Sequence, residues 1–128
     1  MKFLLDTHLL IWTVGNAGRL SPETNAALSD ARNEIFFSAA SLCEIAIKAN
    51  LGRPSFQVDP NRLYRELIHF GYTELPITTA HAVAIFGLPM IHRDPFDRLL
   101  VAQAIVEDIT LLTVDVTLAK YPGPIRKV

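Results

Sequence analysis

Residues 94–115, DPFDRLLVAQAIVEDITLLTVD, contain the two kinds of element that decide the fold. Asp94-Pro95 places a capping residue before a proline, which is a common start of a helix. The apolar stretch that follows predicts a helix to about Glu107. Residues Ile109–Val114 form a run rich in β-branched and aliphatic side chains, which predicts a buried strand. A helix leading directly into a buried strand is typical of a parallel α/β sheet.

The same alternation of strand and helix extends toward the N-terminus. Further strands are predicted at Lys2–Leu5, Ile35–Ser38 and Tyr72–Leu75. Helices are predicted at Leu9–Gly15, at Pro22–Ala31, from Ser41 to Leu51, from Pro60 to Gly71, and after Thr78 or Thr79. Parallel neighbours need crossover connections, and helices usually supply them. We therefore expect an α/β fold with a central parallel sheet of four to five strands flanked by helices; whether Ile125–Val128 adds a last strand is left open.

Composition limits the size and surroundings of this fold. The 128 residues are half apolar, which suits one domain over residues 1–128 with a single core. Cys43 is the only cysteine, so a reducing, cytoplasmic location is expected, with Cys43 itself as a small buried apolar residue. No apolar run is long enough to span a membrane, so no membrane association is expected. The formal net charge of -1 argues against a broad basic surface, and any polyanion would have to be bound locally.

Two acids directly follow predicted strands. Asp6 comes after Phe3-Leu4-Leu5, and Asp115 comes after the strand that ends at Val114. The ligand crevice of an open parallel sheet lies beyond the carboxyl ends of its strands. Asp6 and Asp115 are therefore expected to project from the same edge.

Two further acids lie in the first turns of predicted helices. Glu44 shares a predicted helix face with Ile47 and Leu51, and Asp97 shares one with Val101. This pattern predicts that both acids point inward, toward the edge where the helices begin.

Each acid taken alone has an ordinary structural explanation. Asp94 is an N-cap ahead of Pro95, and Glu44 could complete a capping box with Ser41. Asp6 and Asp115 could cap the helices that follow them. Together they need another explanation, because two carboxylates about 4 Å apart repel by on the order of 4 kcal/mol at an effective dielectric near 20. A bound cation would compensate this repulsion.

The expected cation is Mg²⁺ or Mn²⁺, because the proposed ligands are all oxygen atoms. The chain has no cysteine cluster, and its four histidines include no pair at i and i+4, so they are not expected to be ligands. A magnesium ion with few protein ligands keeps waters that can attack a phosphate. The implied reaction is phosphodiester hydrolysis.

Four segments carry a family resemblance: LLDTHLLIW, SLCEIAIK, HRDPFDRLLVAQA and LLTVD. In order and spacing they resemble the acidic motifs of PIN-domain nucleases, especially the VapC-type toxins of toxin-antitoxin systems, over Lys2 to about Lys120. The resemblance implies a metal-dependent endoribonuclease. It also implies catalytic and metal-binding roles for Asp6, Glu44, Asp97 and Asp115, with Asp6 and Asp97 holding the metal most directly.

The resemblance also suggests supporting residues. Thr7 and Thr113 are expected to hydrogen-bond the acids. Asp94 is an additional carboxylate, interpreted first as a cap, and His8 stands where many members carry Ser or Asn. Three cations, Arg93, Arg98 and Lys48, either hold RNA phosphates or balance the charge of the acids.

Expected partners follow from the same resemblance: an RNA substrate, a cognate antitoxin protein and a second copy in a homodimer. The apolar run Leu9–Val14 exceeds what one helix face needs, which fits either an interface or the core. Two alternatives stay open. A non-catalytic PIN-like interaction module would keep the fold without the chemistry; an aspartyl-phosphate phosphatase is disfavoured because His8 stands where its second Asp is needed.

Overall fold

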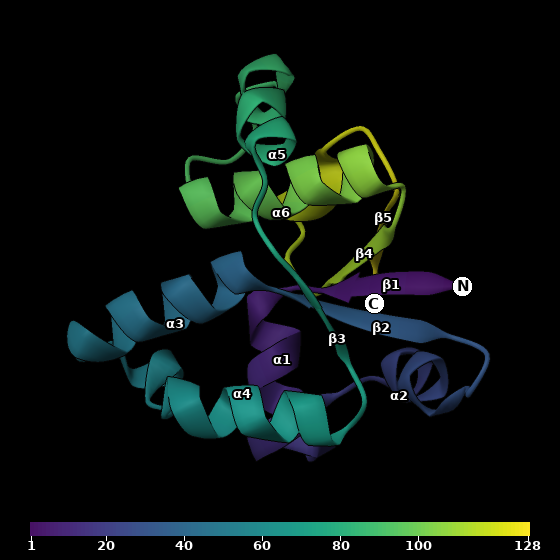
Figure 1. The fold of residues 1–128 in the computed structure, drawn as a ribbon, viewed down its shortest axis with the longest axis vertical. Helices are drawn as coiled ribbons and strands as arrows, with labels where there is room; N and C mark the ends of the chain where they lie inside the picture. The colour runs from purple at the N-terminus through teal and green to yellow at the C-terminus, as the bar shows by residue number, and fades with distance from the viewer.

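Five short strands form a wholly parallel sheet, and β1, β2 and β4 are buried at consecutive positions because both faces are covered. The computed structural model describes residues 1–128, and the strand order is β3-β2-β1-β4-β5 (Figure 1). The strands are β1 (Lys2–Leu5), β2 (Glu34–Ser38), β3 (Thr73–Leu75), β4 (Thr110–Thr113) and β5 (Ile125–Lys127). The central strand is thus the first in the chain, and its two neighbours come from distant parts of the sequence. The α/β class and the parallel sheet are confirmed, and the C-terminal tail adds the fifth strand.

Six helices connect and cover the strands: α1 (Thr7–Gly15), α2 (Pro22–Ser29), α3 (Ala39–Asn50), α4 (Pro60–His69), α5 (Thr79–Ala84) and α6 (Pro95–Glu107). Helices α1, α2 and α4 lie on one side of the sheet, α5 and α6 lie on the other, and α3 extends from its edge (Figure 1). Helices α2, α4 and α6 each begin with proline after a capping side chain that accepts a backbone hydrogen bond. Local sequence therefore sets where these helices start.

The core has two halves, one on each face of the sheet. Phe3 and Leu5 of β1 and Phe37 of β2 face the half covered by α1, α2 and α4. Leu4 of β1 and Phe36 of β2 face the other half, which α6 covers. This period-two alternation is what a sheet covered on both faces requires. None of the helices combines the length and apolarity needed to cross a membrane.

The start of α3 differs from the prediction. Ser38, the last residue of β2, caps the helix by accepting a hydrogen bond from the backbone of Ala40 (3.0 Å). Ser41 was expected in that role but lies inside the helix, so the predicted capping box with Glu44 is wrong. Both serines precede the same apolar stretch, and strand β2 passes into the helix without a loop.

The buried face of α3 also differs from the prediction. Its buried residues are Ala40, Ser41, Glu44 and Ile45, whereas Ile47 and Leu51 are exposed. Cys43, expected to be buried, is exposed as well. The helix extends beyond the sheet, so its second half has little core to cover. Glu44 is buried as predicted, but it shares the buried face with Ala40 and Ile45 rather than with Ile47 and Leu51.

Arg98 holds the loop before α6 against the helix. Its buried guanidinium group donates to the carbonyl oxygens of Pro89 (2.9 Å) and Ile85 (3.2 Å) and to the hydroxyl of Tyr121 (3.1 Å). A planar fork with several N–H groups can reach these acceptors together.

We expect Arg98→Lys to lower the free energy of unfolding by about 2–3 kcal/mol, because an ammonium group cannot reach all three acceptors and leaves buried ones unpaired. Urea unfolding followed by circular dichroism measures this. Arg65→Lys, at an exposed position of α4, is the control and should leave stability unchanged. An Arg98→Lys protein as stable as the wild type would contradict the role.

Candidate active site

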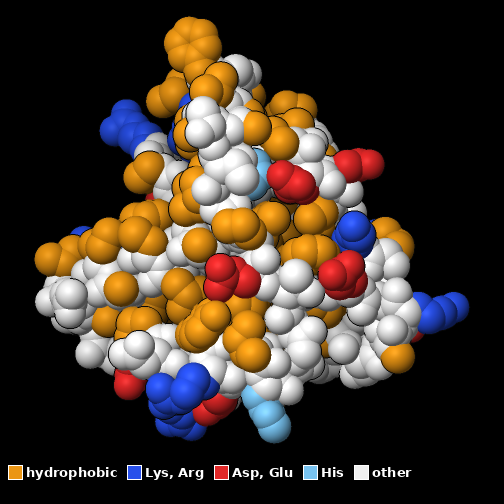
Figure 2. Space-filling view, in the orientation of Figure 1, with side chains coloured by type: hydrophobic (Ala, Val, Ile, Leu, Met, Phe, Trp, Pro, Cys, Tyr) orange, Lys and Arg blue, Asp and Glu red, His pale blue; other side chains and the backbone are white.

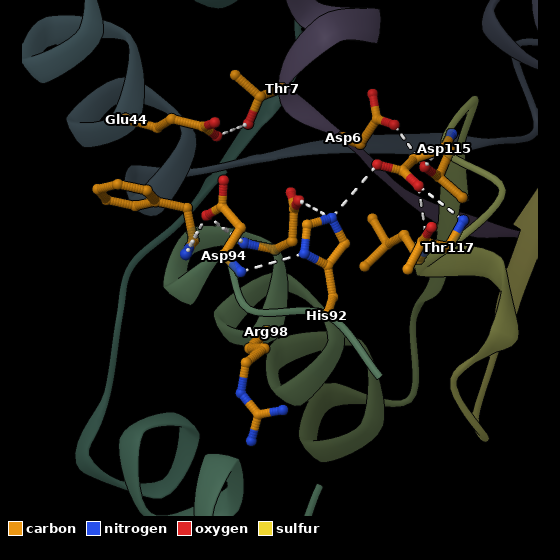
Figure 3. Close-up of polar contacts among 12 residues, drawn as sticks. Asp6, Thr7, Glu44, His92, Asp94, Arg98, Asp115 and Thr117 are labelled. Atoms are coloured by element: carbon orange, nitrogen blue, oxygen red, sulfur yellow. Dashed lines mark hydrogen bonds and ion pairs between the residues drawn. The ribbon is translucent and has the colours of Figure 1, made fainter. Parts of the chain in front are cut away.

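The carboxyl ends of β1 and β4 open into a small pocket of about 240 Å³. Helices α3 and α6 contribute to its wall from either side, as Figure 3 shows. Five acids line it: Asp6, Glu44, Asp94, Asp97 and Asp115. Four elements that are far apart in sequence thus bring every acid singled out from the sequence to one place.

Asp6 is the most firmly held of these acids. One carboxylate oxygen accepts hydrogen bonds from the Thr113 hydroxyl (2.6 Å) and the Val114 backbone (3.1 Å), and the other accepts one from the Leu9 backbone (2.9 Å). Burial raises the pKa of Asp6, and these three hydrogen bonds oppose the rise. Asp6 therefore caps α1 and also ties β1 to β4.

Glu44 forms an ion pair with Lys48. The Thr7 hydroxyl donates to one carboxylate oxygen of Glu44 (2.7 Å), and the Lys48 ammonium group donates to the other (2.6 Å). Lys48 also reaches Asp94 (3.2 Å). Burial opposes the charge on Lys48, but the contacts with Glu44 and Asp94 outweigh it and raise the pKa of Lys48. Lys48 thus neutralises part of the acidic cluster.

Asp94 has two roles in the structure. One of its oxygens caps α6 by accepting from the backbone of Phe96 (2.8 Å) and Asp97 (3.4 Å). The other oxygen contacts Lys48 and lies in the pocket wall. The cap predicted from Asp94-Pro95 is therefore present, and the same side chain also belongs to the cluster.

Asp97 is the acid whose ionised form is least stabilised by its surroundings. Desolvation by burial, followed by repulsion from Asp94, Glu44, Asp115 and Asp6, raises the pKa of Asp97 to about 8. Its one ion-pair contact is with Nε2 of His92 (3.1 Å). The electrostatics of the pocket thus converge on Asp97.

His92 was missed by the sequence argument. Its Nε2 atom lies 3.1 Å from Asp97 and 3.5 Å from Asp115. Its Nδ1 atom accepts a hydrogen bond from the Asp94 backbone (3.1 Å), so in the neutral ring Nε2 carries the proton and donates to Asp97. Potential ligand atoms of His92, Asp97 and Asp115 lie within 4.8 Å of one another, so His92 belongs to the same cluster as the two acids. The only available signal was its position two residues before Asp94.

Asp115 is oriented by the turn that follows β4. One of its oxygens accepts from the backbone of Thr117 (2.7 Å) and Leu118 (3.1 Å). Its own backbone N–H donates to the Thr113 hydroxyl (3.0 Å), the same hydroxyl that donates to Asp6. Thr113 therefore fixes the two strand-end acids relative to each other.

The three cations predicted to contact RNA have different surroundings. Lys48 lies inside the pocket, where it is paired with acids, and Arg93 is exposed on the segment that leads into α6. The Arg98 side chain points away from the acids (Figure 3) and is buried against backbone carbonyls. The prediction that Arg98 holds RNA phosphates is therefore wrong, because adjacent helix residues such as Asp97 and Arg98 point about 100° apart.

The donor set fits a hard divalent cation. It offers carboxylate oxygens in one partly buried pocket, with no thiolate near them, which is the chemistry that Mg²⁺ and Mn²⁺ prefer. Burial and repulsion from the other acids both disfavour the charged form of Asp97, and Lys48 contacts Glu44 and Asp94 rather than Asp97. A cation placed beside Asp97 would relieve this repulsion.

The fold is similar to those of three solved complexes. One chain of VapBC2 from Rickettsia felis, bound to a DNA fragment from its promoter, matches with a TM-score of 0.74 and 17% identity, covering 99% of this chain and 98% of that one. A chain of the DNA-bound VapBC from Salmonella typhimurium matches with a TM-score of 0.67 and 20% identity, with the same coverage. A chain of VapBC-1 from nontypeable Haemophilus influenzae matches with a TM-score of 0.54 and 18% identity, covering 92% of this chain and 90% of that one.

No curated protein matches the chain. The PIN domain family, however, matches residues 3–124, which is nearly the whole sequence and contains all the acids of the pocket. The family predicted from the acidic motifs is therefore confirmed, and this chain belongs to the PIN domain family.

Proposed function

We propose that this protein is a metal-dependent endoribonuclease and the toxin of a toxin-antitoxin pair. The observation that carries the proposal is the cluster of acids at the carboxyl edge of the sheet, in which burial, together with repulsion from the neighbouring acids, raises the pKa of Asp97 to about 8. Such a cluster of carboxylates is suited to binding a divalent cation and a phosphodiester together. The complexes with similar folds contain VapBC proteins, which supports the assignment to a toxin-antitoxin pair.

Asp6 and Asp97 would hold Mg²⁺ or Mn²⁺, with Asp115 and Glu44 completing the site. The bound ion would neutralise charge on the phosphate and lower the pKa of an attacking water. Thr113 keeps Asp6 and Asp115 in register, and Thr7 orients Glu44 toward the pocket. His92 contacts both Asp97 and Asp115, and in this mechanism it donates hydrogen bonds to them or to the substrate.

Protein partners account for the apolar surface in this proposal. Phe86 is 96% exposed, and Val83 and Met90 are also largely exposed around the protruding α5 end (Figure 2). Ile47 and Leu51 are exposed on α3. Patches of this kind mark protein interfaces, here with an antitoxin and with a second copy of the chain. The proposed location is the cytoplasm, where the RNA substrate is found.

The first prediction concerns the acid with the raised pKa. Asp97→Asn should lower the rate of RNA cleavage about 100-fold or more, because an amide keeps the shape of the side chain but binds Mg²⁺ poorly. The measurement is cleavage of labelled total RNA by antitoxin-free protein in Mg²⁺, Mn²⁺ or EDTA.

Asp108→Asn is a matched control. Asp108 ends α6 in a left-handed conformation that Asn also adopts, and it is exposed away from the pocket. This control should cleave like the wild type, and EDTA should abolish cleavage by both. Full activity of folded Asp97→Asn protein, or cleavage that persists in EDTA, would refute the site assignment.

A second prediction concerns pH. The pKa of Asp97 is about 8 in the folded metal-free protein and near 3.8 when unfolded, so between these values the folded state binds the extra proton. Protonation of Asp97 therefore stabilises the folded state relative to its ionised form. This contribution to the free energy of unfolding is fully present below about pH 4 and is lost as the pH rises through about 8. We therefore expect metal-free protein to be less stable to urea at pH 8.5 than at pH 5.5.

The stability of the Asp97→Asn variant to urea should depend less on pH, since its amide does not ionise. In the wild type, Mn²⁺ must displace the Asp97 proton, so affinity measured by calorimetry should rise by up to about tenfold per pH unit below pH 8. If the stability of the two proteins to urea changes equally with pH, Asp97 does not titrate in this range.

A further inference from the structure

A larger groove lies beside the acidic pocket. It has a volume of about 760 Å³ and is bounded by α1, the turn Ala17–Arg19, the segment after α3 and the start of α4. Volumes of about 300–1,000 Å³ are typical of ligand sites. His8 and Ser55 line both cavities, so the groove is adjacent to the pocket that holds the acids.

Planar side chains form much of the groove wall. The guanidinium group of Arg19 lies over the Trp12 ring, 4.2 Å from its centroid. The His8 ring lies 6.0 Å from the Trp12 ring and 5.3 Å from that of Phe56. Arg62 and Asn16 add polar groups. A flat cation stacked on indole, next to an imidazole, is the kind of surface on which nucleobases stack.

We propose that this groove binds a base of single-stranded RNA next to the phosphodiester held at the acids, with Trp12 and Arg19 as the stacking platform. This inference rests on the proposed function. His8, at the boundary between the two cavities, would contact the nucleotide that connects the base in the groove to the cleaved phosphate.

The lining favours a nucleotide over a protein segment. Only four of its thirteen residues are hydrophobic, and Arg19 forms an ion pair with no carboxylate. Arg62 is paired with Glu66 (2.8 Å), and Asp59 also lines the groove, so Arg19 is the main source of attraction for a phosphate or a base. A chain of net charge -1 must bind RNA through such local features, because it has no broad basic surface.

Trp12 is the only tryptophan, so its fluorescence reports on the groove directly. The probe is a single-stranded RNA hexamer of mixed sequence, titrated into Asp97→Asn protein so that it stays intact. We expect the hexamer to quench Trp12 emission and Arg19→Gln to weaken binding several-fold. Arg65→Gln, at an exposed position outside the groove, should leave the affinity unchanged.

Cleavage kinetics give a second measurement. Trp12→Ala should lower kcat/KM about 5- to 150-fold, the range expected for loss of one stacked base, mainly through a higher KM. Trp12→Phe should recover part of the loss because it keeps a ring, and Phe70→Ala, an exposed aromatic outside the groove, is the control. Thermal unfolding identifies any variant that is misfolded. If Trp12→Ala is misfolded, the binding and cleavage measured with Arg19→Gln, a substitution at an exposed residue, test the proposed base subsite instead.

The outcomes separate the two proposals. If RNA quenches Trp12 emission but the wild type cleaves no RNA, the base subsite in the groove is supported and the proposed ribonuclease activity is refuted. Metal-dependent cleavage with no quenching, and an unchanged KM in Trp12→Ala and Arg19→Gln, would overturn the base subsite and leave the groove to a protein ligand.

Discussion

Three hydrogen bonds hold the buried Asp6 carboxylate at the end of the central strand, and the arrangement of the site depends on them. One comes from the start of α1, and two come from the end of β4. They connect the first strand of the chain to a strand more than a hundred residues later. Because the carboxylate is only 4% exposed, it cannot turn toward bulk water to escape the other acids. The other acids of the pocket are therefore arranged around a carboxylate whose position is fixed.

The acids of the pocket differ in how their charge is balanced. Asp6 has three hydrogen-bond donors, Glu44 has Lys48, and Asp115 has the backbone of the following turn. Asp94 shares Lys48 and caps α6. Asp97 contacts only the ring of His92, and burial, together with repulsion from the other acids, raises its pKa. A site of this kind favours any cation that can reach Asp97. The groove lined by Trp12 and Arg19 lies beside it, where the proposed RNA substrate would extend from the acids.

Much of the fold was predictable because the signals are local. The pair Asp94-Pro95 located the start of α6, and the rule that ligands gather at the carboxyl edge brought together acids from β1, α3, α6 and β4. The errors arose where tertiary contacts decide. Ser38 and Ser41 are equally good caps by residue type, and only the direct passage from β2 into α3 selects Ser38. The burial of Arg98 depends on hydrogen bonds to the carbonyl oxygens of the preceding loop. The position of His92 depends on a hydrogen bond from the backbone N–H of Asp94. A periodic sequence pattern predicts neither contact.

The strand order also has a consequence for synthesis. A chain emerges from the ribosome N-terminus first, so β1, β2 and β3 are available long before β4. Until β4 is made, the edge of β1 that pairs with it has no partner strand. The hydrogen bond between Asp6 and Thr113 spans 107 residues, so it can form only after the whole segment between them has been translated. Asp97 and Asp115 are also translated late. A nascent chain therefore has an incomplete acidic pocket until β4 and Asp115 have been translated, and the proposed cleavage of RNA could not begin before then.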